Sequence, residues 1–201
     1  MTAIIDYRAG NLTSVKNAFA AIGEETTVTS DPAAIAAAER VVFPGVGAAK
    51  SAMRSLTELG LAGAVREAAA TKPFLGICLG MQILFEHTEE DGGVDMLGIL
   101  PGRVRRFPDV PGFKVPEIGW NQVEGSDPRG LITHMDEYYF VHSYYVEMNP
   151  AAVGQTEYAG VKFASAVRRG NLFATQFHPE KSGTVGLALL QAFLEKGAAT
   201  C

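Results

Sequence analysis

The chain is poor in the residues on which disulfide-stapled and metal-dependent folds rely. Its 201 residues include only two cysteines, Cys78 and Cys201, and only four histidines. Two cysteines this far apart, one of them at the end of the chain, do not make a disulfide framework. We therefore expect the core alone to hold the fold, and we expect neither a metal ion nor a cofactor.

Basic residues and long apolar runs are scarce as well. The chain has 17 Lys and Arg against 22 Asp and Glu, a net charge of −5, which argues against nucleic acid as the main partner. Its densest basic group, Arg103, Arg105 and Arg106, is typical of a solvated strand face. No apolar run approaches the length of a membrane span. The N-terminus enters an expected strand directly, without a signal peptide, so we expect a cytoplasmic protein.

The composition is that of a globular protein, and we expect one domain over residues 1–201. Hydrophobic residues make up 47% of the chain and charged residues 19%, proportions typical of a folded protein. In the first half, apolar runs at 3–6, 26–29, 41–43 and 74–77 alternate with helical patterns at 11–22, 32–38 and 53–70. This order predicts an α/β fold with an open, mostly parallel sheet and flanking helices.

The second half has a different pattern. From 100 to 169, glycine, proline and short β-rich runs dominate. They predict a smaller antiparallel β region with strands at 103–107, 138–145, 153–158 and 163–167. A last helix is expected at 184–196. Because active sites of parallel sheets lie at the carboxyl ends of the strands, we expect Pro44, Cys78 and His178, each just past a strand, to converge.

Cys78 ends one of the apolar runs. It follows Phe74-Leu75-Gly76-Ile77 and precedes Leu79-Gly80-Met81-Gln82, where a helical pattern begins. Glycines two residues to either side leave room for a strained strand-to-helix turn, a nucleophile elbow with sulfur in place of the serine oxygen. The positive end of the next helix would favour the thiolate. The alternative is a small buried cysteine that ends a core strand.

A thiol nucleophile needs a base, and His178 is the best-placed histidine. It follows an apolar run that starts at Leu172, and Pro179-Glu180 comes next. A carboxylate two residues from a histidine at a strand end can fix the imidazole tautomer, as the third member of a triad does. The alternative is a loop histidine beside a solvated glutamate. A thiol nucleophile also implies a reducing compartment.

A glycine turn supplies a candidate oxyanion hole. The apolar residues 41–43 run into Pro44, Gly45, Val46 and Gly47. Two glycines let backbone N–H groups point into a cavity, as an oxyanion hole requires, and the N–H of Leu79 would be the second donor. An ordinary strand-to-loop turn is the alternative. A phosphate-binding loop is discounted, because neither a Gly-Lys-Ser/Thr ending nor a G-x-G-x-x-G pattern is present.

Together these segments resemble the class I, or triad, glutamine amidotransferases. The Gly-x-Cys-x-Gly-x-Gln elbow at 76–82 and the His-Pro-Glu at 178–180 are shared across that class. The blocks Gly119-Trp120-Asn121 and, at 139–144, Tyr-Phe-Val-His-Ser-Tyr resemble in particular the glutaminase subunits of imidazole glycerol phosphate synthases, which serve histidine biosynthesis. The resemblance extends from Ile4 to about Leu194.

The resemblance implies a set of site residues. Cys78, His178 and Glu180 would hydrolyse glutamine to glutamate and ammonia. The amino-acid moiety of glutamine would be bound by five residues: Gln82, Glu90, His142, Ser143 and Tyr144. Among them His142 is expected to line the substrate site or to support the structure, rather than to act as a second base.

The resemblance also implies a partner. A separate cyclase subunit, a (β/α)8 barrel, would form a heterodimer with this chain, receive the ammonia through a protected channel, and make imidazole glycerol phosphate and aminoimidazole carboxamide ribotide. The expected contact residues are Asn11, Pro116, Trp120, Asn121, Tyr139 and Lys181. Trp120 is expected in a glycine-rich loop at this interface. Arg8 and Glu117-Ile118 depart from the family's usual small residue and His-Met pair on the side expected to face the partner.

Three rival functions stay open. The chain could be the glutaminase subunit of another class I amidotransferase, such as one that serves purine or aminobenzoate synthesis. It could be a stand-alone cysteine hydrolase, although Gln82 argues against that. It could also be a non-catalytic sensor that kept the fold, although the intact set of Cys78, His178 and Glu180 argues otherwise.

Overall fold

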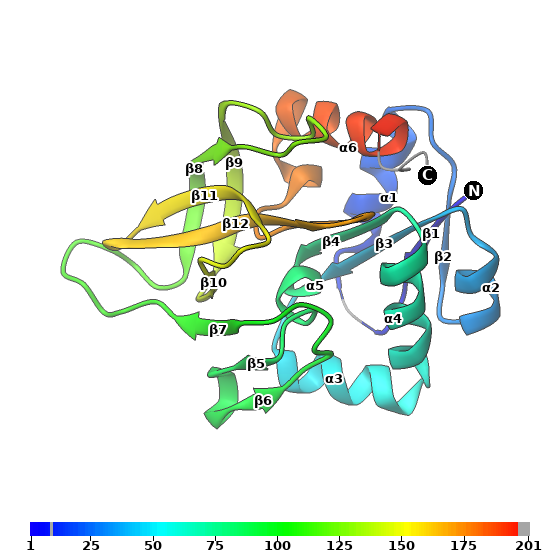
Figure 1. The fold of residues 1–201 in the computed structure, drawn as a ribbon, viewed down its shortest axis with the longest axis horizontal. Coiled ribbons are helices and arrows are strands. Elements are labelled where there is room, and N and C mark those ends of the chain that lie inside the picture. The colour runs from blue at the N-terminus through cyan, green and yellow to red at the C-terminus, as the bar shows by residue number, and fades with distance from the viewer. Residues whose placement is uncertain (9, 197–201) are drawn as a thin grey trace.

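The computed structural model describes residues 1–8 and 10–196, in which helices cover both faces of one thirteen-stranded sheet (Figure 1). The first half forms the strands β1 (Thr2–Ile5), β2 (Thr26–Thr29), β3 (Arg40–Gly45) and β4 (Phe74–Cys78). Its helices are α1 (Leu12–Ala21), α2 (Pro32–Ala37), α3 (Ala49–Glu58), α4 (Leu61–Thr71) and α5 (Leu79–Gln82). Together with β13 (Leu172–Thr175), the four strands run parallel in the order β2-β1-β3-β4-β13. The expected α/β fold is confirmed.

Alternate residues of the central strands pack on opposite faces of the sheet. Ile4 and Val42 belong to the core cluster that also contains Phe19 of α1 and Leu190 of α6 (Gly183–Lys196). Their neighbours on the same strands face the other core cluster, which contains residues of α2, α3 and α4. Strands buried on both faces explain why these runs are continuously apolar.

The helical pattern across 53–70 is interrupted, contrary to expectation. It forms two helices, because Gly60 has a φ of 66° between the end of α3 and the start of α4. A residue in this left-handed conformation cannot continue a helix, and glycine adopts it without strain. Two other helix ends show local signals: the Asp31 side chain accepts from the backbone N–H of Ala33 at the start of α2, and Gly23, with a φ of 82°, follows α1.

The antiparallel strands continue the same sheet from β13. They are β7 (Arg103–Arg106), β8 (Glu117–Gly125), β9 (Met135–His142), β10 (Tyr144–Glu147), β11 (Ala152–Tyr158) and β12 (Val161–Arg169). Two short strands, β5 (His87–Thr88) and β6 (Val94–Asp95), lie at one edge, and η1 (Glu90–Gly92) and η2 (Pro179–Lys181) are 3-10 turns. The strand expected at 138–145 is divided at Ser143, because β9 pairs with β8 whereas β10 pairs with β7 and β12.

Strand β8 was not expected, and it corrects the assignment of Trp120 to a loop. Trp120 lies opposite Tyr139 of β9 in an antiparallel pair. At the start of β8 the inward and outward positions are reversed relative to hydrophobicity, since Glu117 is buried and Ile118 is exposed, whereas Val123 near its end is buried as usual. The apolar alternation by which a strand is recognised in a sequence is therefore missing here.

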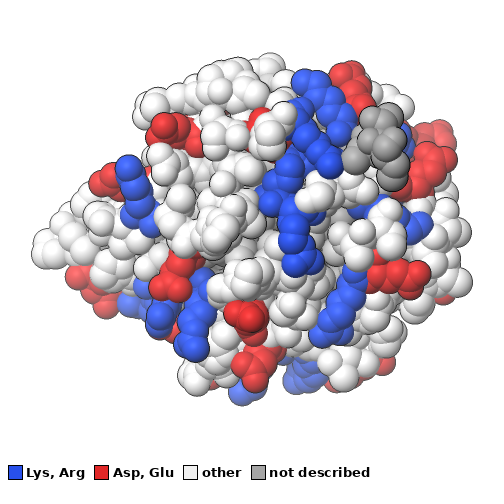
Figure 2. All heavy atoms as spheres, in the orientation of Figure 1, with Lys and Arg blue, Asp and Glu red and all other residues white. Residues whose placement is uncertain are grey.

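Charges of both signs are spread over the surface. Figure 2 shows acidic and basic side chains on the same face, and neither sign covers it alone. No helix among residues 1–8 and 10–196 is long and apolar enough to cross a membrane.

Candidate functional site

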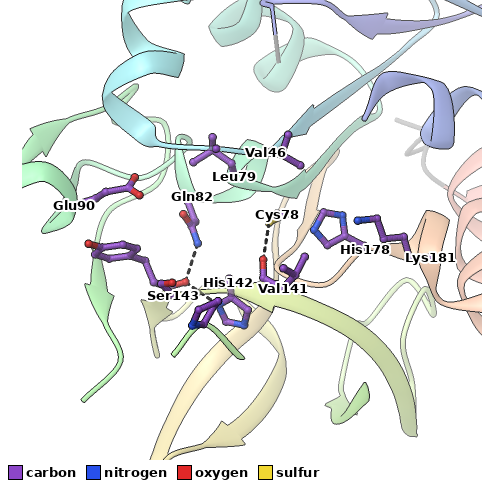
Figure 3. A pocket seen from close by; sticks show the side chains of 13 residues that line it. Val46, Cys78, Leu79, Gln82, Glu90, Val141, His142, Ser143, His178 and Lys181 are labelled. Atoms are coloured by element: carbon purple, nitrogen blue, oxygen red, sulfur yellow. Dashed lines mark hydrogen bonds between the residues drawn. The ribbon is translucent and has the colours of Figure 1, made fainter. Parts of the chain in front are cut away.

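The carboxyl ends of β3, β4 and β13 meet β9 and β10 around a cavity of about 350 Å³ (Figure 3). Its lining consists of Val46, Gly47, Cys78, Leu79, Gln82, Glu90, Pro116, Val141, His142, Ser143, Tyr144, His178 and Lys181. Of the residues that the sequence assigns to catalysis, the oxyanion hole and substrate binding, only Gly45 and Glu180 are not part of this lining. The strand ends have brought together segments that are about a hundred residues apart in the chain.

Cys78 occupies the apex of a strained turn. Its φ of 53° and ψ of −112° are rare for a residue with a side chain. A Cβ on Gly80 would collide with the backbone carbonyl oxygen of Phe43 in β3, and a Cβ on Gly76 would lie 3.0 Å from that of Ala174 in β13. The two glycines therefore let β4 pack between its neighbours while the Cys78 thiol, largely buried, lines the cavity.

The helix after this turn is shorter than expected. α5 has only four residues, so few peptide dipoles align behind the thiol and its macrodipole is weak. The helix N-terminus that the sequence suggested as a source of thiolate stabilisation therefore contributes little. Other groups around the Cys78 sulfur must favour the thiolate.

His178 and Glu180 are in direct contact. Nδ1 of His178 lies 2.8 Å from Oε1 of Glu180, and the two side chains are 1% and 0% exposed. The side-chain amide of Asn11 donates a hydrogen bond to the same Glu180 oxygen at 2.8 Å. A buried carboxylate is costly without such donors. The pair holds the imidazole with its other nitrogen, Nε2, free for chemistry, and His178 lies beside Cys78 (Figure 3).

The surroundings of His178 favour its charged form. Burial alone lowers the pKa of the imidazole, but the charge and hydrogen bond of Cys78 and those of Glu180 outweigh burial and raise the pKa to about 10. Nε2 makes no hydrogen bond of ordinary geometry with residues 1–8 or 10–196, and such catalytic contacts commonly tighten only when substrate binds. The raised pKa of His178 therefore favours an imidazolium beside Cys78.

Strand β9 holds the turn that carries His178. The His178 backbone N–H donates to the Tyr139 carbonyl oxygen at 2.9 Å, and the Tyr139 N–H donates to Oγ of Ser182 at 3.0 Å. Oγ of Ser182 in turn donates to the His178 carbonyl oxygen at 2.7 Å. This closed ring of bonds makes the position of the imidazole depend on β9, the same strand that forms one wall of the cavity.

The glycine turn that follows β3 lies beside the turn that carries Cys78. Val46 and Gly47 line the cavity, and Gly47 has a φ of 96°. Gly45, which the sequence grouped with them, is instead the last residue of β3, paired with Cys78 and buried beneath the site. Of the three residues, only Val46 and Gly47 are therefore placed to point a backbone N–H at a substrate, together with Leu79 on the other side.

Gln82, Glu90 and Ser143 lie at one end of the cavity (Figure 3), and Tyr144 also belongs to its lining. Nε2 of Gln82 donates to the Tyr144 carbonyl oxygen at 2.8 Å, so its Oε1 is left as an acceptor. Oε2 of Glu90 accepts from the backbone N–H of Ala49 at 2.6 Å. Burial raises the pKa of Glu90 despite that bond. Two acceptors at this end suit an ammonium group.

His142 is part of a buried polar pair rather than a second base for Cys78. Its Nδ1 donates to the Tyr144 carbonyl oxygen at 2.7 Å, and its Nε2 lies 3.0 Å from Oε2 of Glu117. Oε1 of Glu117 accepts from the side chain of Asn121 at 2.8 Å. Glu117, expected to face a partner, is thus turned inward, and so is the side chain of Asn121.

An exposed aromatic and basic group flanks the cavity. Trp120 is 55% exposed and Ile118 is 63% exposed. The rings of Trp120 and Tyr139 meet edge to face with their centroids 6.2 Å apart, and Nζ of Lys181 lies 6.0 Å from the Tyr139 ring centroid. Asn11, also expected at a partner contact, donates a hydrogen bond to Glu180, and its contact with a partner stays a prediction.

Two residues near the nucleophile had no role in the sequence argument. The Gln176 side-chain amide donates to Sγ of Cys78 at 3.7 Å, and the Val141 carbonyl oxygen lies 4.0 Å from the same sulfur. Gln176 could have been noticed, because it directly follows the strand that leads to His178. Nothing in the sequence marks Val141, because its contribution is a backbone atom.

Known proteins similar to this chain match it over nearly its whole length. The family model described as "Glutamine amidotransferase class-I" matches residues 3–196. The imidazole glycerol phosphate synthase subunit HisH of Acinetobacter baylyi is 48% identical over 198 residues, covering 96% of this chain and 97% of its own length. The subunits of the same name from Aromatoleum aromaticum and Methanothermobacter thermautotrophicus are 52% and 50% identical, covering 96% and 97% of this chain and 96% and 98% of their own.

Solved structures share the fold at lower identity. A crystal structure described as a glutamine amidotransferase superimposes with a TM-score of 0.75 at 19% identity, over 98% of this chain and 99% of its own. PurLQS from Thermotoga maritima gives a TM-score of 0.74 at 18% identity, over 96% of this chain and 97% of that chain. At these identities the likeness extends to the fold alone.

Proposed function

The chain belongs to the class I glutamine amidotransferases and, within them, to the HisH subunits of imidazole glycerol phosphate synthase, and from this premise we propose that Cys78, His178 and Glu180 are its catalytic triad. The chain is the glutaminase subunit of that synthase and serves histidine biosynthesis. The observation that carries the triad assignment is the buried 2.8 Å contact between His178 and Glu180 beside the strained Cys78. In this proposal residues 1–201 form a single domain that performs the hydrolysis.

The proposed reaction has two stages. The Cys78 thiolate attacks the side-chain carbonyl carbon of glutamine, and the charge that develops on the oxygen is taken by N–H groups of Leu79 and of Val46 or Gly47. The His178 imidazolium gives its proton to the amide nitrogen, which leaves as ammonia. The neutral imidazole then removes a proton from water, which attacks the thioester and releases glutamate and the thiolate.

The amino-acid end of glutamine would lie against Gln82 and Glu90. The free Oε1 of Gln82 and the Glu90 carboxylate are acceptors for the α-ammonium group, and neither can serve a carboxylate. Ser143 and Tyr144 also line the cavity. The cavity volume of about 350 Å³ is sufficient for a single amino acid.

The name of its relatives describes a subunit, which implies a partner that uses the ammonia. We infer that this partner is a cyclase of the (β/α)8 barrel type and that the two chains form a heterodimer. The exposed Trp120 and Ile118 beside the cavity, with Lys181 on its rim, suit such a contact, since tryptophan is enriched at interface hot spots. A cytoplasmic location fits an enzyme whose nucleophile must stay a reduced thiol.

The test is to measure glutamine hydrolysis by the chain alone, with the barrel subunit, and with the barrel subunit and its substrate. We expect the chain alone to be a poor glutaminase and each addition to raise the rate, because partner binding would shift the Val46-Gly47 loop toward a conformation with its N–H groups in the site. Equal rates under all three conditions would favour a stand-alone hydrolase instead.

A further inference from the structure

A line of buried hydrogen bonds ends on the nucleophile. Nε2 of Gln82 donates to the Tyr144 carbonyl oxygen at 2.8 Å and to Oε1 of Gln176 at 2.9 Å. Nε2 of Gln176 donates to Sγ of Cys78 at 3.7 Å. Gln176 is 0% exposed and Gln82 is 6% exposed, so water competes little for these bonds.

The backbone fixes the direction of this line. The Tyr144 carbonyl oxygen can only accept, so the end of Gln82 that meets it must be the NH₂ group. The same NH₂ group faces Gln176, and therefore the end of Gln176 that meets it must be oxygen. The NH₂ group of Gln176 is then the end that points at the Cys78 sulfur. Rotating the Gln82 amide by half a turn would set its oxygen against the Tyr144 carbonyl oxygen, and rotating the Gln176 amide would set its NH₂ group against that of Gln82.

A donor aimed at sulfur acts differently on the two states of the nucleophile. A hydrogen bond to an ionised acceptor is roughly twice as strong as one to a neutral acceptor. The Val141 carbonyl oxygen, 4.0 Å from the same sulfur, can accept from the thiol but offers the thiolate nothing. Because α5 is a single turn, its dipole is a weak source of thiolate stabilisation.

We propose that Gln176 stabilises the Cys78 thiolate by donating a hydrogen bond to Sγ, with Gln82 and the Tyr144 carbonyl oxygen setting the direction of that donor. The inference rests on the proposed role of Cys78 as the nucleophile. It adds a second partner for the charged sulfur, directly after β13, besides the His178 imidazolium. The same Gln82 that would bind substrate then also orients the group that activates the thiol.

The first experiment measures thiol reactivity in a Cys201→Ser background, in which Cys78 is the only cysteine. The rate of alkylation by iodoacetamide is followed against pH for the unaltered site and for Gln176→Glu. Glutamate keeps the oxygen that accepts from Gln82, replaces the donor by an acceptor and, when ionised, adds a negative charge near the sulfur. We expect the alkylation profile to move to higher pH and the rate at neutral pH to fall about tenfold, equivalent to about 1.4 kcal/mol.

Gln176→Met tests the same donor without adding a charge, and Gln191→Met is its matched control. Gln191 lies on α6 and its side chain contacts the exposed Glu195. Gln176→Met should move the profile in the same direction by a smaller amount, and Gln191→Met should leave it unchanged. A fall in kcat for glutamine without any movement of the alkylation profile would mean that Gln176 only supports Gln82, and would overturn the proposal.

A measurement on the unaltered site needs no substitution at Gln176. The side-chain NH₂ resonance of Gln176, followed by NMR, should shift with the same midpoint as the alkylation rate of Cys78. A resonance that does not respond to ionisation of the thiol would overturn the proposal even if both variants failed to fold. If instead the unaltered complex did not hydrolyse glutamine while the alkylation profile still moved, the proposed function would fail and this inference about the thiol would stand.

Discussion

Replacing Cys78 with alanine should make the His178 imidazolium much easier to deprotonate. Burial, the largest single influence, lowers the pKa of His178, and the charge and hydrogen bond of Cys78, then those of Glu180, raise it to about 10. Both influences of Cys78 exceed both of those from Glu180. Among the groups that raise this pKa, Cys78 is therefore the one whose removal should lower it most.

The expected size of the effect follows from the typical strength of such a contact. A pKa of about 10, instead of the ordinary 6.5, corresponds to about 5 kcal/mol in favour of the imidazolium. The influences that raise the pKa exceed this figure, since they also offset burial. An opposite charge in contact typically moves a pKa by about 1–3 units, so without Cys78 the imidazolium should lose about 2 kcal/mol, which weakens proton binding roughly thirtyfold.

The assay is an NMR titration of the His178 ring in the wild-type chain and in Cys78→Ala. At pH 8 the wild-type ring should be almost fully protonated, whereas a large neutral fraction should appear in the variant. Alkylation provides a control, because iodoacetate attaches a negatively charged carboxylate through the sulfur and should preserve more of the raised pKa than neutral iodoacetamide does. Identical titration midpoints in wild type and Cys78→Ala would refute the thiolate–imidazolium pair.

The raised pKa of His178 determines in which direction the folding stability changes with pH. The unfolded chain holds the His178 proton only below about 6.5, whereas the folded chain holds it to about 10. Stability from this proton is therefore fully present below pH 6.5 and is lost as the pH rises through 10. In Cys78→Ala the loss should be complete at a lower pH, as measured by urea unfolding across this range.

Further outcomes are expected from single substitutions. Glu180→Gln should reduce glutamine hydrolysis less than removal of the base does, since Glu180 orients a proton carrier without transferring a proton; steady-state kinetics of both variants decide this. Gly80→Ala should abolish activity and lower the Tm by several degrees, because the new Cβ would meet the Phe43 carbonyl oxygen. Its control is Gly63→Ala in α4, which has open space around it and should be neutral or stabilising by about 0.5–1 kcal/mol. Glu117→Ala should cost about 1–3 kcal/mol of unfolding free energy, because the polar side chains of His142 and Asn121 lose the carboxylate beside them, and an unchanged urea midpoint would contradict this role of Glu117.

The sequence by itself determined the reactive groups and the layout of the parallel sheet. Both depend on local signals: a strand that ends in Cys78 between two glycines, and a strand followed by His178, a proline and Glu180. Strand ends of a parallel sheet meet at one edge, so local patterns were sufficient to predict which residues converge. The break at Gly60 is also local, but the periodicity on both sides concealed it.

Only the tertiary structure decided which residues distant in the sequence contact Cys78 and Glu180. Asn11 donates to Glu180 across 169 positions of sequence, and Gln176 reaches Cys78 across 98. Strand β8 exists because β9 and β11 pair with it, although its own residues place Glu117 inside and Ile118 outside. A hydrogen-bond partner or a reversed strand face depends on what packs opposite, which periodicity in one segment does not contain. The nature of the chemistry could therefore be predicted from the sequence, whereas the support of the nucleophile depends on contacts that only folding creates.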